Sequence, residues 1–241
     1  MQNIVTTPQA VQHVPERDYS LLSGERQVGR SLDDIRRDHT VRYELAERVI
    51  RLCQYESSNI LDLFCGNGYG TYLVARDFAK AQVFGVDGSN EAIDMANEYY
   101  SLPNNLFSFK RYPFRLPEGA FDFVICFESL EHVEEDHSLL REICGSLKPG
   151  GRALISVPNQ ERHPLEKNPH QFHFRHYRHD DFLRMAMFGF SLESWYGQDV
   201  YSFSPEGINT FQLLPPAQME LKQGVSGQVN IFLLRKKASP S

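Results

Sequence analysis

Short apolar runs alternate with amphipathic stretches along most of the chain, and this alternation predicts an α/β protein. The clearest run, residues 60–64, contains one acid and stops at three glycines on alternate positions. Such a run is typical of a buried strand that turns sharply into a loop. The predicted strands are 60–64, 83–87, 105–110, 121–127, 152–157, 190–196 and 229–235, and the predicted helices are 35–54, 71–80, 90–100, 136–147 and 182–188.

The glycine loop and the strand after it form a pattern typical of nucleoside binding. Gly66, Gly68 and Gly70 lack a Cβ atom, so the backbone there can approach a ligand closely or adopt a positive φ. The amides at the start of the following helix are a natural seat for a carboxylate or phosphate. The next strand ends in Asp87, and an acid at the tip of this second strand suits the two hydroxyls of a ribose.

Residues 62–70 read Asp-Leu-Phe-Cys-Gly-Asn-Gly-Tyr-Gly, and this segment resembles the first motif of class I S-adenosylmethionine-dependent methyltransferases, D/E-x-x-x-G-x-G-x-G. Dinucleotide-binding proteins instead carry G-x-G-x-x-G, with the third glycine one place later. The resemblance covers roughly residues 40–200. Its further blocks are 121–124, 130–133, 147–151 and 156–159.

The resemblance implies a Rossmann-like, seven-stranded mixed sheet with helices on both faces, an antiparallel last strand and an N-terminal helical cap. It implies an arm and cap over 1–37 and a methyltransferase domain over 38–237, with an acceptor-site insertion at 158–182. The expected cofactor is S-adenosylmethionine. The residues expected to contact it are Arg42, Asp62, Phe64, Cys65, Gly66, Gly68, Gly70, Asp87, Gly88, Tyr112 and Phe127.

Two of the expected cofactor contacts lie outside the glycine loop. Residues 24–26 and 39–43 resemble the cap of bacterial methyltransferases found with surface-polysaccharide genes, and this likeness makes Arg42 the candidate cation for the methionine carboxylate. The alternative is that Arg42 lies on a solvated helix face. The family usually carries an acid for the adenine amino group after the third strand, whereas this chain reads Lys-Arg-Tyr at 110–112. Tyr112 or a backbone carbonyl is expected to replace that acid.

The segment after the fourth strand contains the catalytic candidates. If it is helical, Glu128, Glu131 and His132 share one face. His132 is then the candidate general base, with Glu131 orienting its imidazole. Alternatively, all three residues hold a divalent cation such as magnesium, as a similar Glu-x-x-Glu-His segment is thought to do in ubiquinone-pathway O-methyltransferases. A third interpretation is that Glu131 and His132 are scaffold.

Histidines recur every third residue at His170, His173, His176 and His179. An extended chain would place alternate histidines on opposite faces, so a zinc site in this tract is not expected. Residues 168–177 resemble the Asn-Pro-x-His-x-x-x-Phe/Tyr element of the polysaccharide-associated methyltransferases. That likeness implies that His173 lines the acceptor pocket, where it is a second catalytic candidate.

Composition narrows the choice of partner and compartment. The net charge is −6, with no long Lys/Arg block, so no nucleic-acid partner is expected. Four dispersed cysteines suggest reduced thiols in a cytoplasmic protein. No apolar run approaches the ~20 residues of a membrane span.

Together, the sequence predicts a methyltransferase that uses S-adenosylmethionine and acts on an oxygen of a sugar, a glycan or another small-molecule acceptor. A quinone-type small-molecule methyltransferase is the first alternative. The second is a non-catalytic partner subunit that binds S-adenosylmethionine without turning it over.

Overall fold

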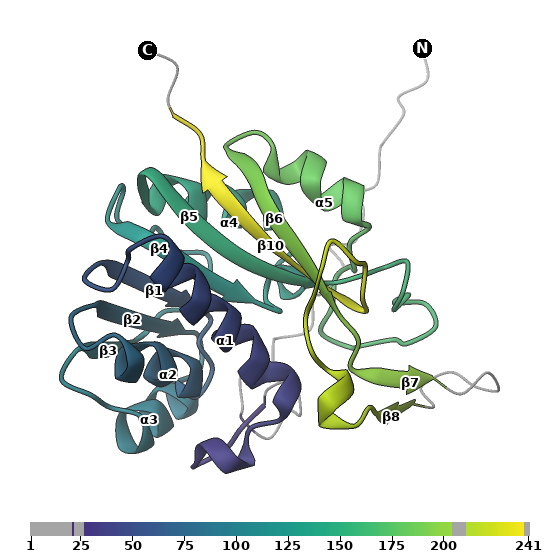
Figure 1. The fold of residues 1–241 in the computed structure, drawn as a ribbon, viewed down its shortest axis with the longest axis horizontal. Helices are drawn as coiled ribbons and strands as arrows, with labels where there is room; N and C mark the ends of the chain where they lie inside the picture. Colours follow the sequence, from purple (N-terminus) through teal and green to yellow (C-terminus); the bar gives the residue numbers. More distant parts are fainter. Residues whose placement is uncertain (1–20, 22–26, 204–210, 239–241) are drawn as a thin grey trace, which may run out of the picture.

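The computed structural model describes residues 21, 27–203 and 211–238. Its centre is an eight-stranded sheet in the order β3-β2-β1-β4-β5-β10-β6-β9 (Figure 1). Strands β3, β2, β1, β4 and β5 pair in parallel, whereas β10 runs antiparallel to both β5 and β6. The strands are β1 (Asn59–Leu63), β2 (Gln82–Asp87), β3 (Asn105–Phe109), β4 (Phe121–Phe127), β5 (Leu147–Pro158), β6 (Phe190–Gln198), β9 (Lys222–Gln223) and β10 (Val229–Lys236). A separate two-stranded sheet pairs β7 (Tyr201–Phe203) with β8 (Phe211–Leu213).

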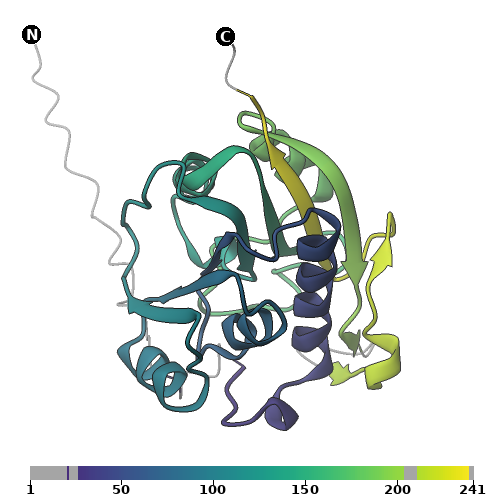
Figure 2. The ribbon, with the colours of Figure 1, turned by 60° about the vertical axis from the view of Figure 1, so that its left-hand side comes forward.

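Helices cover both faces of the large sheet (Figures 1 and 2). One apolar cluster joins α1, α2 and α3 to the sheet through residues such as Ala46, Val74 and Ile60. The other cluster joins α4 and α5 to the opposite face, as Leu139 and Phe182 illustrate. The α-helices are α1 (Arg37–Leu52), α2 (Tyr69–Asp77), α3 (Asn90–Tyr99), α4 (Asp136–Ser146) and α5 (His179–Ala186). Short 3-10 helices lie at η2 (Leu32–Asp34), η3 (Leu130–His132) and η4 (Pro216–Gln218).

The strand order reverses between β1 and β4. The chain moves outward through β2 and β3 on one side of β1, and then continues through β4 and β5 on the other side. The connections that leave β1 and β4 therefore diverge, and open α/β sheets bind their ligands in the crevice formed at such a point. The fold thus positions a site at the carboxyl ends of β1, β2 and β4.

The predicted sheet is confirmed. Its seven strands correspond to β1 to β6 and β10, and the last of them is antiparallel as expected. Strand β9 is an addition, because the stretch 205–224 was predicted to be a loop but contains β8, η4 and β9 in its described part. Strand β5 begins at Leu147 instead of residue 152, since Leu147 pairs with Phe121 across a register shift. Helix α5 begins earlier than predicted, at His179. Two acids in its first turn stabilise this start, because the N-terminal end of the helix dipole is positive.

Two sequence expectations concern the chain outside this core. Residues 24–26 of the expected cap lie outside the described residues. Among the described residues, no helix is both long enough and apolar enough to span a bilayer.

A buried carboxyl group connects three elements beneath the glycine loop. Asp62 on β1 is 1% exposed and accepts hydrogen bonds from the Tyr43 hydroxyl of α1, at 3.1 and 3.2 Å, and from the Thr71 hydroxyl of α2, at 2.7 Å. Burial raises the pKa of Asp62 to about 7, although both hydroxyls oppose this rise and the nearby Asp87 adds to it. The side chain therefore exchanges its proton near neutral pH.

The raised pKa predicts a pH-dependent stability. The unfolded chain ionises Asp62 near pH 4 and the folded chain near pH 7, so the contribution of this group to folding is complete below pH 4 and is lost as the pH rises to 7. A shift of this size corresponds to roughly 4 kcal/mol. The unfolding free energy of Asp62→Asn minus that of the wild type should therefore rise between pH 4 and 7 in urea titrations.

An exposed acid on helix α3 provides the control. Asp94→Asn removes a carboxylate from the surface in the same way and is the matched variant for this measurement, because Asp94 is exposed. If the Asp62→Asn difference instead falls with pH, the two hydroxyls stabilise the ionised carboxylate more than burial destabilises it.

Candidate active site

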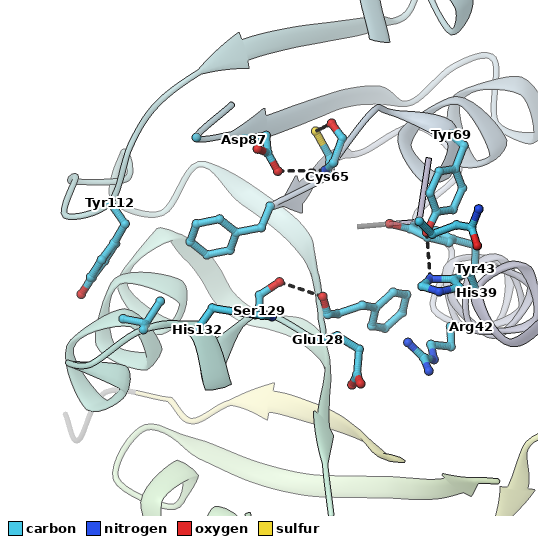
Figure 3. Close-up of a pocket in the computed structure, with 16 residues that line it drawn as sticks. His39, Arg42, Tyr43, Cys65, Tyr69, Asp87, Tyr112, Glu128, Ser129 and His132 are labelled. Carbon is cyan, nitrogen blue, oxygen red and sulfur yellow. Dashed lines mark hydrogen bonds between the residues drawn. The ribbon is translucent and has the colours of Figure 1, made fainter. Parts of the chain in front are cut away.

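A pocket opens at the carboxyl ends of β1, β2 and β4. Figure 3 shows Asp87 and Cys65 on one wall, the α1 residues His39 and Arg42 on a second, and Tyr112 and His132 on the side away from α1. The pocket therefore extends from the glycine loop to the segment that contains the catalytic candidates.

Two strand ends in the pocket have unusual backbone conformations. Phe64 follows β1 with φ of 61°, and Glu128 follows β4 with φ of 45°. Positive φ is costly for a residue with a Cβ atom, and such residues cluster at functional sites. The Glu128 backbone is fixed by Ser156, whose Oγ accepts from the Glu128 amide at 2.9 Å and donates to its carboxylate at 2.8 Å. Phe64 and Glu128 follow the carboxyl ends of the adjacent parallel strands β1 and β4, and both residues line the pocket.

The three glycines of the loop have different surroundings. Gly66 has φ of 57° and lines the pocket, and a Cβ atom added there would meet nothing within 4 Å. A Cβ atom at Gly68 would lie 2.6 Å from that of Ala96, and one at Gly70 would lie 1.8 Å from the Tyr43 ring. Only Gly66 of the three lines the pocket, whereas the other two permit helix α2 to pack closely against α1 and α3.

Asp87 is held in a fixed orientation at the end of β2. Its Oδ2 accepts from the Gly66 amide at 2.9 Å, and its Oδ1 accepts from the Ser89 amide at 2.9 Å. The residue is 1% exposed and lines the pocket. An ionised carboxylate only accepts hydrogen bonds. The carboxylate is therefore preorganised for hydroxyl donors in the pocket.

Helix α1 brings a cationic group to the second wall. The Arg42 guanidinium is buried, donates from Nε to Gln198 Oε1 at 2.7 Å, and lies 3.9 Å from the Asp38 carboxylate. Burial opposes ionisation of Asp38, but the hydrogen bond from Arg36 and the neighbouring cations outweigh it and lower its pKa to about 2. Burial lowers the pKa of His39 to about 3 against the pull of Asp38. The Arg42 guanidinium is therefore the cationic group that helix α1 brings to this wall of the pocket.

Tyr112 lies at the opposite rim of the pocket. Its ring packs edge-on against Phe114, with centroids 5.5 Å apart, and the Phe114 ring also lies 6.0 Å from that of Phe64. Arg111 donates from Nε to the Gly88 carbonyl at 3.2 Å, which ties the loop after β3 to the loop after β2. This rim therefore offers aromatic surface and backbone atoms in the place where the family usually has an acid.

Four other histidines form a chain of contacts that begins at His132. The His132 and His173 rings are perpendicular with centroids 4.6 Å apart, and His170 stacks on His173 at 3.9 Å. His173 Nδ1 lies 2.8 Å from His176 Nε2, and His176 Nδ1 lies 2.6 Å from the His163 carbonyl. Burial and the surrounding imidazoles lower the pKa of His173 far below its usual range, and burial also lowers the pKa of His176. Both imidazoles therefore bind a proton less readily than an exposed histidine does.

This cluster corrects two expectations. The histidines of the tract were expected on opposite faces of an extended chain, but a turn, in which the His173 amide donates to the His170 carbonyl at 3.1 Å, brings three of them together. His179 alone is separate and packs on Trp195. Among the described residues, the group that could hold one metal ion is Glu131, His132 and His173, and not the predicted set with Glu128.

The structure gathers most of the predicted residues around one pocket. Glu131 and His173 lie behind His132, while Asp62, Gly68 and Gly70 lie beneath the loop and do not line the pocket. Predicted residues that line it are Arg42, Phe64, Cys65, Gly66, Asp87, Gly88, Tyr112, Phe127, Glu128 and His132. Lining residues that the prediction did not include are Gln27, His39, Tyr43, Tyr69, Ser129 and Val133. His39 and Tyr43 are one turn apart on the amphipathic helix that carries Arg42. This spacing places them on the same side of the helix, so it could have predicted that they line the pocket.

A family described as a methyltransferase domain matches residues 37–195, which is more than half of the 241-residue chain. The chain belongs to this family. The predicted class I methyltransferase fold is thereby confirmed, and the family supports S-adenosylmethionine as the cofactor.

Individual relatives agree with the family. A mitochondrial ubiquinone biosynthesis O-methyltransferase of Schizosaccharomyces pombe is 36% identical over 108 residues, covering 43% of this chain and 39% of that protein. A trans-aconitate 2-methyltransferase of Delftia acidovorans is 29% identical over 120 residues, covering 48% and 44%. The matches therefore span less than half the length of these relatives. The structure of a methyltransferase from Thermotoga maritima has a TM-score of 0.58 at 19% identity and covers 83% of this chain and 92% of its own, a likeness that shows the fold.

The different surroundings of the glycines predict different phenotypes. Gly70→Ala should destabilise the fold by several kcal/mol in urea titrations, since its methyl group collides with the Tyr43 ring. Gly66→Ala should cost only about 1 kcal/mol for its left-handed backbone, but it should weaken S-adenosylmethionine binding in calorimetry because its methyl group enters the pocket.

A double variant tests the collision directly. Tyr43→Ala removes the ring that Gly70→Ala strikes, so the double variant should lose less stability than the sum of the two single losses. Additive losses would show that the two residues do not compete for the same space.

Proposed function

We propose that this protein transfers the methyl group of S-adenosylmethionine to a hydroxyl oxygen of a small, ring-shaped acceptor. The observation that carries the proposal is the continuous pocket, which has Asp87 and Arg42 at its cofactor walls and His132 on the remaining side. S-adenosylmethionine supplies an activated methyl group, so the work of the protein is to align the acceptor and to accommodate its proton.

The residues present fit this cofactor. Gly66 lines the pocket, and a Cβ atom added there would meet no other atom within 4 Å. The Asp87 carboxylate, oriented by two backbone amides, would receive the ribose hydroxyls. The Arg42 guanidinium, positioned by Gln198 and Asp38, would attract the methionine carboxylate. Tyr112 and the Gly88 backbone, at the rim without the usual acid, would contact the adenine.

The acceptor side has the chemistry that a hydroxyl needs. Its proton must leave as the oxygen attacks, and His132 is the imidazole that lines the pocket on this side. His173 is a poor proton acceptor, because its pKa is held far below neutral by burial and by neighbouring imidazoles. We therefore propose that His132 accepts the proton of the acceptor hydroxyl. Glu131 and His173 lie next to it.

Ring-shaped acceptors are supported by the aromatic character of the insertion. His163 contacts the Tyr201 and Phe203 rings at centroid distances of 6.0 and 5.2 Å, and His170 lies 5.9 Å from Phe172. Aromatic surface suits a sugar ring or a phenolic ring. The resemblance to polysaccharide-associated enzymes favours a sugar or glycan, whereas the relative named for ubiquinone biosynthesis favours a quinone precursor.

An acceptor screen tests the activity and separates the two classes. Purified protein with S-adenosylmethionine should add one methyl group to members of a panel of nucleotide sugars, glycans, catechols and tricarboxylates, measured by mass spectrometry. Methylation of catechols alone would select the quinone-type alternative. Tight S-adenosylmethionine binding without turnover of any acceptor would instead indicate a non-catalytic partner subunit.

The assignment of Asp87 predicts a loss of cofactor affinity. Removing a charged hydrogen-bonding partner costs about 1.5–3 kcal/mol, so Asp87→Ala should weaken S-adenosylmethionine binding at least tenfold in calorimetry. Asp94→Ala on the exposed side of α3 is the matched control and should bind normally. Unchanged affinity in Asp87→Ala would place the ribose elsewhere.

The assignment of His132 predicts a loss in the chemical step. His132→Ala should lower kcat by roughly 10²–10⁴-fold, while affinity for S-adenosylmethionine stays near that of the wild type. His137→Ala, an exposed histidine on α4, controls for the general effect of removing an imidazole. A His132→Ala enzyme with normal kcat and a raised KM would show that the residue only holds the acceptor.

A further inference from the structure

The cluster beside the pocket unites residues from two distant segments. Glu131 and His132 belong to η3, directly after β4, whereas His173 belongs to the segment between β5 and α5. One ligand atom from each of the three side chains lies within 4.8 Å of the others. Glu131 is fully buried, and His132 and His173 are partly buried.

Specific contacts fasten the second segment over the first. The Phe174 amide donates to the Glu131 carbonyl at 2.8 Å. Arg175 pairs with the buried Asp136 carboxylate at 2.6 Å, and the Tyr177 hydroxyl donates to the same carboxylate at 2.9 Å. These three contacts flank His173 on its carboxyl side, so its position beside His132 is built into the fold.

A relay of hydrogen bonds determines which nitrogen of His173 carries a proton. The His163 carbonyl can only accept, so the His176 Nδ1 beside it must carry a hydrogen. In the tautomer that carries this hydrogen on Nδ1, His176 Nε2 is unprotonated, and His173 Nδ1 is its donor at 2.8 Å. The remaining nitrogen, His173 Nε2, keeps its lone pair. Metal-binding histidines are typically oriented in this way, through a hydrogen bond from the other ring nitrogen.

We infer that Glu131, His132 and His173 form a binding site for one divalent transition-metal ion of the zinc or cobalt class. Two imidazoles and one carboxylate are the donors of catalytic zinc sites that keep an open position. This donor set is softer than the oxygen-rich set preferred by magnesium. Ligands of one tetrahedral ion lie roughly 3.3 Å apart, since each bond is about 2 Å. The ligand atoms, which lie within 4.8 Å of one another, therefore need to approach by at most about 1.5 Å.

This inference rests on the proposed function, because His132 lines the same pocket. An ion held there would polarise a bound acceptor hydroxyl and ease the loss of its proton to solvent water. The acceptor oxygen would then form its bond to the methyl carbon as the carbon–sulfur bond of the donor breaks. His132 would in that case act through the ion instead of taking the proton itself.

Direct binding tests the site without relying on activity. The full chain is treated with chelator, returned to metal-free buffer and titrated with Zn²⁺ in a calorimeter and with Co²⁺ in a visible spectrophotometer. We expect one ion per chain and a Co²⁺ spectrum of a four- or five-coordinate site. His173→Ala and Glu131→Gln should each weaken binding at least tenfold. His176→Ala should weaken it about 10–100-fold by releasing the His173 ring.

Matched histidines provide the controls. His179→Ala removes another member of the same tract, which packs on Trp195, and His137→Ala removes an exposed histidine, so both variants should bind the ion normally. Thermal unfolding and S-adenosylmethionine binding are measured for every variant to show that it is folded. A wild type that binds S-adenosylmethionine but no Zn²⁺ or Co²⁺ would overturn the inference and leave the proposed methyl transfer standing. Metal binding that depends on Glu128 and not on His173 would overturn it as well.

Discussion

The carboxyl group of Asp62 is the point on which the cofactor half of the molecule depends. It is buried in the sheet, yet it accepts hydrogen bonds from α1 and α2 at once. Because Tyr43 must reach Asp62, its ring lies across the start of α2, and only a glycine fits there. One buried acid thus explains why α1 crosses the glycine loop at this place, and why the same helix delivers Arg42 to the pocket.

The acceptor half depends on a second buried carboxylate. Asp136 starts α4 and receives both Arg175 and Tyr177 from the segment that follows β5. The bridge between Asn159 and Tyr177 closes that segment at its two ends. A chain stretch without regular structure is therefore held in one conformation by a few polar contacts, and those contacts place its histidines beside η3.

The sequence predicted the cofactor half well because its determinants are local. A strand, a glycine loop, a helix and a terminal acid within residues 60–87 determine both the fold and the position of Asp87. The sequence could not distinguish the function of Gly66 from that of Gly70. Gly70 is needed because the Tyr43 ring, which lies on another helix, leaves no room for a Cβ atom. Gln198 was missed for the same reason, because it meets Arg42 only after β6 has joined the sheet.

The histidine tract shows how local reasoning fails in the acceptor half. The histidines recur every third residue, and they were expected on alternate faces because the chain was assumed to be extended. The chain instead turns after His170. Burial then changes the chemistry of the residue that the turn brings to His132. An imidazole whose pKa is lowered by burial accepts a proton poorly, but its unprotonated nitrogen remains an electron-pair donor. The environment that weakens His173 as a base therefore favours it as an electron-pair donor to a metal ion. A site that needs both a base and a metal ligand must use two different histidines, or it must use the ion in place of the base.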